Sequence, residues 1–223
     1  MFRQRFLLWI MCFSLALAVP SYGAEKRPTG NPPTVVEGGP STCDLAVYKS
    51  EDSGPIAVAV PDNDPAGVDV GTLQSGAFDG TRFTDIIVDL RMSHTYVNDL
   101  VATVTYHDPC DGPALAFADI LLFPPCEGDL DGTTTYFFSD GAACGLGASC
   151  GCPATLPGGC YQPSILNALS GFDGLFKGGC WKLNIADLAQ LDLGLVTGWS
   201  VHMLQAPTST HLSSWGSVKT LYR

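Results

Sequence analysis

The chain has 223 residues and carries 22 Asp and Glu against 11 Lys and Arg, which gives a formal net charge of -11 at pH 7. The basic residues do not cluster along the sequence, and nucleic-acid binding needs clustered Lys and Arg to contact phosphates. We therefore expect no nucleic-acid partner, and the acidic surplus fits either calcium binding or simple solubility.

The first 23 residues have the layout of a secretory signal peptide. Arg3 and Arg5 precede an apolar run at residues 6–19, and small residues follow at 21–24. The run is shorter than the roughly 20 residues that span a bilayer, so an uncleaved anchor is the weaker alternative. We expect cleavage near Gly23 and export to the cell envelope (periplasm or cell surface) or the medium, with no transmembrane segment after cleavage.

Residues 24–55 open with a stretch rich in Pro, Gly and Thr, and they are expected to form a linker or an N-terminal arm. Residues 205–223 form a C-terminal tail in which Trp215, Val218 and Leu221 recur at three-residue spacing. This spacing fits either a short amphipathic docking segment or a frayed terminus.

Between residues 56 and 204, short apolar runs alternate with Gly, Pro, Asp and Asn, which is typical of an antiparallel β-protein. The segments 84–92, 98–107, 181–185 and 199–203 each alternate apolar and polar side chains. One apolar and one polar face on each strand predicts two sheets packed face to face, with wet outer faces. The expected fold is a single all-β sandwich domain.

Nine cysteines occur, and Cys12 lies in the expected signal peptide. The eight others are Cys43, Cys110, Cys126, Cys144, Cys150, Cys152, Cys160 and Cys180. An even number of cysteines in an exported chain predicts up to four disulfides, whose pairing the sequence leaves open. A zinc site from the four cysteines between residues 144 and 160 is the weaker alternative, because their spacing is irregular and no histidine lies among them.

Five segments in sequence order carry a resemblance to a known family. They are VPDNDPAGV at 60–68, HTYVNDL at 94–100, GDLDGTT at 128–134 with Phe137 and Asp140 after it, YQP at 161–163 with WKLNIAD at 181–187, and the stretch 192–201. Together they resemble the IPDNDPAGV, HTYxGDL, GDNxxGTxFxDxA, FRP…GTWTLTVTD and closing WSL.F motifs of the P domain (P/Homo B domain) of proprotein convertases and subtilisin-like proteases. Asn98 stands where that family usually has glycine, and Val196 where it usually has leucine.

The resemblance implies a jelly-roll β-sandwich, of the galactose-binding-domain-like kind, with about eight antiparallel strands between residues 56 and 204. In that family the domain usually follows a subtilisin-like catalytic domain and stabilises it, and it also occurs in bacterial secreted proteins without a protease. This sequence departs from the family at 109–128 and 141–162, where the cysteines indicate disulfide-pinned loop insertions.

The sequence does not predict an enzyme. The serine and histidine motifs of subtilisin-like proteases, GTSxAxP and HGTxVAG, are absent. One G-x-S-x-G match surrounds Ser149, but it lies in a Cys- and Gly-rich loop rather than between a strand and a helix. The four histidines, His94, His107, His202 and His211, are scattered and are expected to be strand-face or turn residues.

Calcium is the cofactor that the acidic loops favour, because it binds clustered oxygen ligands in tight turns. The candidate ligands are Asp99, Asp129, Asp131 and Asp140, of which Asp129 and Asp131 lie two apart in a Gly-flanked loop. Asp62 and Asp64 form a second acidic turn, in which they are either ligands or simple turn formers.

These observations predict an exported, non-catalytic binding or accessory module that presents loops on a rigid scaffold to a protein or a glycan. One alternative is an accessory of a separately encoded, secreted subtilisin-like serine protease, and another is a glycan-binding or structural extracellular component. A groove lined by aromatic residues would favour a glycan, and an exposed apolar patch would favour a protein partner.

Overall fold

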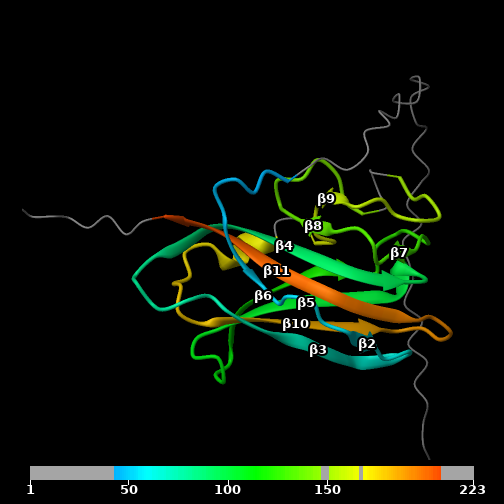
Figure 1. Cartoon of the computed structure of the whole chain (residues 1–223), viewed down its shortest axis with the longest axis horizontal. Helices are drawn as coiled ribbons and strands as arrows, with labels where there is room; N and C mark the ends of the chain where they lie inside the picture. The colour runs from blue at the N-terminus through cyan, green and yellow to red at the C-terminus, as the bar shows by residue number, and fades with distance from the viewer. Residues whose placement is uncertain (1–42, 147–150, 166–167, 207–223) are drawn as a thin grey trace, which may run out of the picture. The chain divides into compact units, whose positions relative to one another are not determined.

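The computed structural model describes residues 43–146, 151–165 and 168–206, and these residues form β-strands joined by loops and two short 3-10 turns (Figure 1). The expected signal peptide at 1–23, the arm up to residue 42 and the tail from residue 207 lie outside the described residues. In the part of the chain that is described, no helix is long and apolar enough to cross a membrane.

Two sheets make up the sandwich (Figure 1). The larger sheet contains β1 (Lys49–Asp52), β2 (Val58–Val60), β4 (Arg82–His94), β7 (Leu130–Asp131), β8 (Tyr136–Phe138), β9 (Gly159–Tyr161) and β11 (Gly194–Ala206). Its order is β1–β11–β4–β8–β9, with β2 paired to β11 and β7 paired to β4. The smaller sheet has the order β3–β10–β5–β6, from β3 (Asp64–Gln74), β10 (Cys180–Asp187), β5 (Leu100–His107) and β6 (Ala114–Leu122). The 3-10 turns are η1 (Val97–Asp99) and η2 (Leu169–Phe172).

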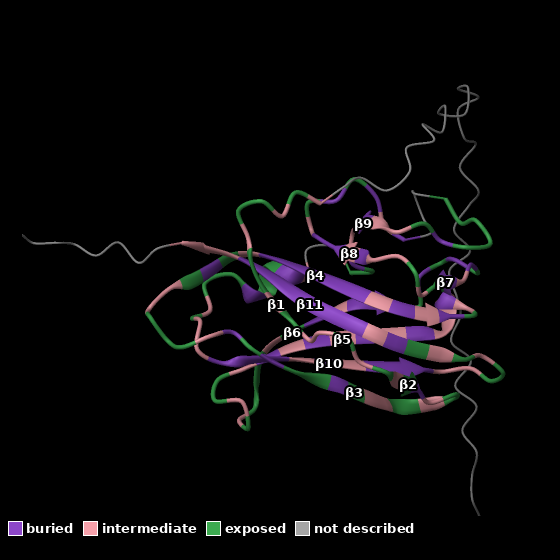
Figure 2. Ribbon diagram, viewed as in Figure 1, coloured by how far each residue is buried: buried purple, intermediate pink, exposed green. Residues whose placement is uncertain are grey.

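The two sheets bury between them the apolar faces that the sequence pattern predicts (Figure 2). Alternate residues of β4, β5 and β10 have no exposed surface: Ile86, Val88, Leu90, Met92, Leu100, Ala102, Val104, Tyr106, Trp181, Leu183 and Ile185. Each large apolar side chain contributes about 1.5–3 kcal/mol when it is fully buried. The all-β sandwich predicted from the sequence is confirmed.

The structure corrects three details of the expected fold. The segment 109–128, expected to be a loop insertion, contains β6, the edge strand of the smaller sheet. The alternation of β6 is hidden because Leu115 and Phe117 are apolar yet exposed, while the residues that alternate with them, Ala114, Ala116 and Ala118, are alanines. The expected arm ends in β1, which pairs with β11. The strand count exceeds eight because β1, β2, β7, β8 and β9 have only two to four residues each, and β8–β9 is a parallel pair.

Disulfides fasten the loops to the sandwich, which confirms the prediction made from the cysteines. The pairs are Cys43–Cys160, Cys110–Cys180 and Cys126–Cys152. Cys144 is disulfide-bonded as well, and Cys150 lies outside the described residues. Because Cys152 and Cys160 are bonded to cysteines outside the proposed zinc group, their sulfurs are not thiolates and the zinc alternative loses its ligands. Three disulfides indicate an oxidising environment.

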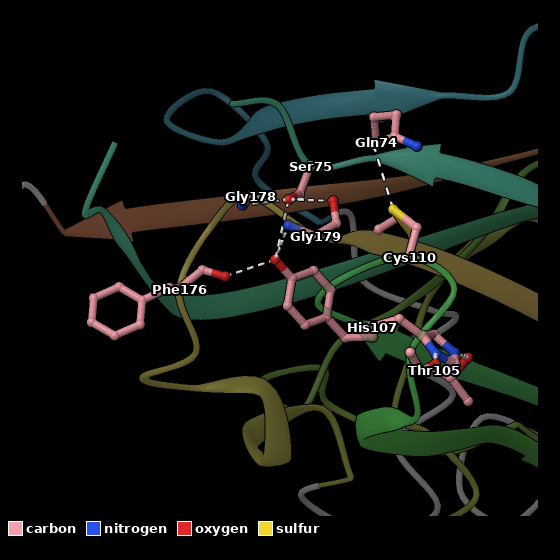
Figure 3. Close-up of a disulfide and its surroundings, with 11 residues drawn as sticks. Gln74, Ser75, Thr105, His107, Cys110, Phe176, Gly178 and Gly179 are labelled. Carbon is pink, nitrogen blue, oxygen red and sulfur yellow. Dashed lines mark hydrogen bonds between the residues drawn. A yellow bond between two sulfur atoms is a disulfide. The ribbon is translucent and has the colours of Figure 1, made fainter. Parts of the chain in front are cut away.

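Phe176 and Gly179 lie near Cys110 at one end of the sandwich (Figure 3), and the hydroxyl group of Tyr106 joins these two residues. Tyr106 Oη donates to the carbonyl oxygen of Phe176 at 2.6 Å and accepts from the backbone N–H of Gly179 at 2.8 Å. The ring packs on Trp181, with 4.6 Å between the ring centroids. A buried hydroxyl needs such partners, and here they tie the loop before β10 to the core.

The opening motif at 60–68 contains a glycine that the fold requires. Gly67 has φ +64, and a Cβ atom there would lie 2.5 Å from the carbonyl oxygen of Ile185. The amide of Asn184 donates to the carbonyl oxygen of Ala66 at 3.3 Å. The chain at the start of β3 therefore approaches β10 so closely that only glycine fits.

We expect Gly67→Ala to lower the free energy of unfolding clearly more than Gly54→Ala. Gly54 has a similar φ of +66, but a Cβ there would meet nothing within 4 Å. Both variants place an L-residue at positive φ, which costs about 1–2 kcal/mol, and only the first adds a clash with a backbone carbonyl. Denaturant unfolding of the two variants measures the difference, and equal losses would contradict the close approach at Gly67.

Candidate functional site

Segments far apart in the sequence meet at one end of the sandwich, which we call the acidic end: Asp62, Asp99, Asp187 and Asp192, with His94 among them. The strand register brings them together. Gly194 pairs with both Val60 and His94, so the loop before β3, the turn after β4 and the β10–β11 loop lie side by side. Asp187, the last residue of β10, pairs with Leu100, the first residue of β5, directly after Asp99.

A fully buried pair, His94 and Asp187, lies at the base of the acidic end. Nε2 of His94 is 3.2 Å from Oδ2 of Asp187, and neither side chain is exposed. Nδ1 of His94 accepts a hydrogen bond from the backbone N–H of Tyr96 at 3.1 Å, so we assign the ring proton to Nε2, which donates to Asp187. The pair is closely packed, because a Cβ at Gly194 would lie 2.8 Å from the His94 ring.

Asp99 lies among other carboxylates. Burial raises the pKa of Asp99, and the nearby negative charges of Asp192 and Asp187 raise it further, against an opposing effect of His94. A side-chain interaction with Asp192 raises the pKa of Asp99 as well, because two neighbouring carboxyl groups favour a proton on one of them. The acidic end therefore holds like charges in close proximity, and either protonation or a bound cation would stabilise it.

The structure does not bring the four candidate calcium ligands together. Asp131 accepts four hydrogen bonds of 2.8 to 3.2 Å from Thr133 and Thr134, which close its own turn. Asp140 accepts from the N–H groups at the start of η2, at 3.3 and 2.7 Å. Asp129 is a backbone partner of the segment 154–156. Asp99 lies near Asp192 and Asp187, whereas Asp140 lies near Asp173. Among the described residues, no group of three or more His, Cys, Asp or Glu is arranged to hold a metal ion, and calcium binding stays a prediction.

The β10–β11 loop, residues 188–193, is held in place by polar side chains from the other two segments. The backbone N–H of Leu191 donates to both carboxylate oxygens of Asp62, at 3.1 and 3.3 Å. Thr95 Oγ1 donates to Asp192 at 2.6 Å and accepts from the N–H of Leu193 at 3.3 Å. Asp62 thus has a structural partner, and the loop is fixed while the side chains of both leucines are exposed.

A cleft of about 620 Å³ lies beside η1 and is walled by the Cys126–Cys152 disulfide. Its lining residues are Asn98, Pro125, Cys126, Glu127, Gly128, Cys152, Pro153 and Ala154. None of these is aromatic, whereas carbohydrate recognition commonly uses aromatic rings as stacking platforms. The cleft does not meet the expectation set for a glycan-binding groove.

The outer face of the larger sheet, expected to be wet, carries a buried polar network. Ser50 Oγ is 2.5 Å from Nδ1 of His202, and Nε2 of His202 is 2.7 Å from Oδ2 of Asp89. The network continues through ion pairs and hydrogen bonds of Arg91, Asp52 and Ser200. The segment held by Cys43–Cys160 lies beside this face, where Tyr48 donates to Asp85.

This Ser–His–Asp chain escaped the sequence analysis, because its members lie on three strands and up to 152 residues apart. Such a chain alone does not make a hydrolase, since acyl transfer also needs donors for the oxyanion and a pocket for the acyl group. Ser50 is the partner of His202 in the β1–β11 register. We interpret the network as the fastening of β1 to the sheet, while Ser149 lies outside the described residues.

Comparison with known proteins identifies no family for the chain. No family model matches it, and no curated protein matches it. Solved structures that are similar to part of it include the following two. One is the complex of the Aeromonas sobria serine protease with its chaperone (TM-score 0.35, 11% identity, covering 72% of this chain and 28% of that chain). The other is infectious bursal disease virus, Gt strain (TM-score 0.33, 15% identity, covering 89% and 41%). This chain thus spans well under half of each matched chain, and both scores are too low to bear on its function.

We expect Asp99→Asn and Asp131→Asn to change stability in opposite directions near neutral pH. The pKa of Asp99 is raised in the folded protein, so its contribution is favourable at low pH and is lost as pH rises through that pKa. Asp99→Asn should therefore raise the melting temperature at pH 7. It should also reduce the rise in melting temperature that acidification causes in the unaltered chain.

Hydrogen bonds from Thr133 and Thr134 lower the pKa of Asp131, so its contribution is present above the unfolded pKa of about 3.9 and is lost as pH falls below it. Asp131→Asn should lower the melting temperature at pH 7. Thermal unfolding in chelator from about pH 3 to pH 8 tests both variants. A loss of stability in Asp99→Asn at pH 7 would contradict the like-charge arrangement.

Proposed function

We propose that this chain is an exported, non-catalytic module resembling a P domain, and that it acts as a binding or accessory component for a protein partner. The proposal rests on contacts among the segments that resemble motifs of the P domain. Gly67 and Ala66 of the first segment contact Asn184 and Ile185 of the fourth, and His94 of the second bonds to Asp187 of the fourth. Contacts in space between residues of different motifs support a P-domain-like architecture more strongly than matches along the sequence do.

A protein partner fits the surface better than a glycan does. Leu191 and Leu193 are 93% and 77% exposed on the fixed β10–β11 loop, and an apolar surface on a rigid scaffold favours association with another protein. The cleft beside η1 has no aromatic lining residue. The partner class that the resemblance favours is a separately encoded, secreted subtilisin-like serine protease.

Export is supported by the disulfides together with the signal-peptide pattern in the first 23 residues. Calcium would act as a structural ion, neutralising the like charges around Asp99 and Asp192. The protein would then bind its partner with a more rigid acidic end in calcium than in chelator.

We expect affinity capture with the tagged full chain from the secreted and envelope fractions of the source organism to recover a serine protease in calcium, and less of it in chelator. Asp99→Asn is the matched control, because it removes a charge at the acidic end while leaving the leucines in place. It should recover the protease with little dependence on calcium. Recovery of envelope or glycan components without any peptidase would contradict the protease link.

A further inference from the structure

We propose that the β10–β11 loop is the docking site itself, and that its partner presents an apolar pocket with Lys or Arg side chains at its rim. The proposal rests on the proposed function and deepens it. Leu191 and Leu193 are the anchors, and the carboxylates of Asp62 and Asp192, which are hydrogen-bonded to this loop or lie in it, complement the rim.

The leucines contribute little to this fold. Leu191 and Leu193 are 93% and 77% exposed, and Leu195, at the start of β11, is 40% exposed. Val196 and Trp199, further along the same strand, are fully buried, so the chain changes from exposed to buried apolar residues where the loop enters the sheet. Single exposed leucines are ordinary, but three at alternate positions, two on the fixed loop and one at the start of β11, form an apolar surface.

The backbone of Leu191 is strained. Its φ is +83, a left-handed conformation in which a side chain larger than hydrogen is unfavourable and glycine is the usual residue. Because the side chain is almost wholly exposed, no packing against the described part of the chain compensates for the strain. Strain of this kind concentrates at sites that bind or react, and it holds the Leu191 side chain away from the core.

The loop is ordered before any partner binds. Asp62 fixes the N–H of Leu191, and Thr95 fixes both Asp192 and the N–H of Leu193. At the base, Asp187 accepts from the N–H of Ala189 at 3.1 Å. Binding through a loop that is already ordered avoids much of the entropy loss that flexible loops suffer on association.

The charges around the leucines are of one sign. Asp62, Asp99 and Asp192 lie in the segments that form this end, and His94 is buried with Asp187. None of the five Lys and Arg in the described residues lies in 61–64, 94–99 or 187–195. Complementary charge favours a basic rim on the partner and disfavours an anionic membrane, so we assign a protein rather than a lipid surface.

Photo-crosslinking locates the contact. A benzoylphenylalanine in place of Leu193 should form an adduct with a protein from the secreted fraction. The adduct should map to an apolar peptide flanked by Lys or Arg and weaken from about 50 mM to about 500 mM salt. The same probe in place of Leu115 is the control, since Leu115 is exposed on β6 near the opposite end of the smaller sheet. Adducts only to lipid, or to an acidic peptide, would overturn the proposal.

A second variant separates this inference from the proposed function. Leu191→Gly relieves the backbone strain, so its melting temperature should stay the same or rise, while partner recovery falls on the order of 10- to 100-fold through loss of one buried leucine. Full recovery by Leu191→Gly would refute the loop as the docking site and leave the proposed function standing. Failure of the unaltered chain to recover any protein would refute both.

Discussion

The buried hydrogen bond between His94 and Asp187 is the interaction on which the acidic end depends, because it joins the end of β4 in one sheet to the end of β10 in the other. Both side chains are fully buried, and a polar group left there without a partner costs about 1–3 kcal/mol or more. Asp187 also fixes the start of the β10–β11 loop through the N–H of Ala189. The His94–Asp187 pair therefore fixes the positions of Asp192 and the exposed leucines, although neither member of the pair reaches the surface.

The two ends of the smaller sheet are closed in different ways. The contacts at one end are directed into the core, and those at the other end hold apolar side chains at the surface. At one end the hydroxyl of Tyr106 and the Cys110–Cys180 disulfide join loops to an aromatic core, with every contact directed inward. At the other end the polar contacts fix a loop whose apolar side chains point away from the core. Loops that carry binding residues on a rigid scaffold are the usual arrangement in β-sandwiches, and the acidic end fits that arrangement.

Much of the sandwich could be predicted from the sequence, because period-two alternation reports directly which side chains face a core. The alternate residues Ile86, Val88, Leu90, Met92, Trp181, Leu183 and Ile185 are buried as the pattern required. β6 was hidden because Leu115 and Phe117 are apolar and exposed. Asp129, Asp131 and Asp140 were chosen as calcium candidates by proximity in sequence, whereas Asp131 and Asp140 accept hydrogen bonds from different backbone segments. The Ser50–His202–Asp89 chain depends on strand register, and no local pattern reports register between distant strands.

The polar contacts hold the β10–β11 loop rigid, with its leucines exposed, before any partner is present. Amide hydrogen exchange of the full chain, followed by mass spectrometry on peptides covering 187–195, tests it most directly. The amides of Leu188, Ala189, Leu191 and Leu193 all donate hydrogen bonds, so we expect them to exchange at rates close to those of β10. Exchange as fast as that of an unstructured peptide would contradict it, because exposed leucines on a mobile loop would need neither the strain nor the polar contacts described here.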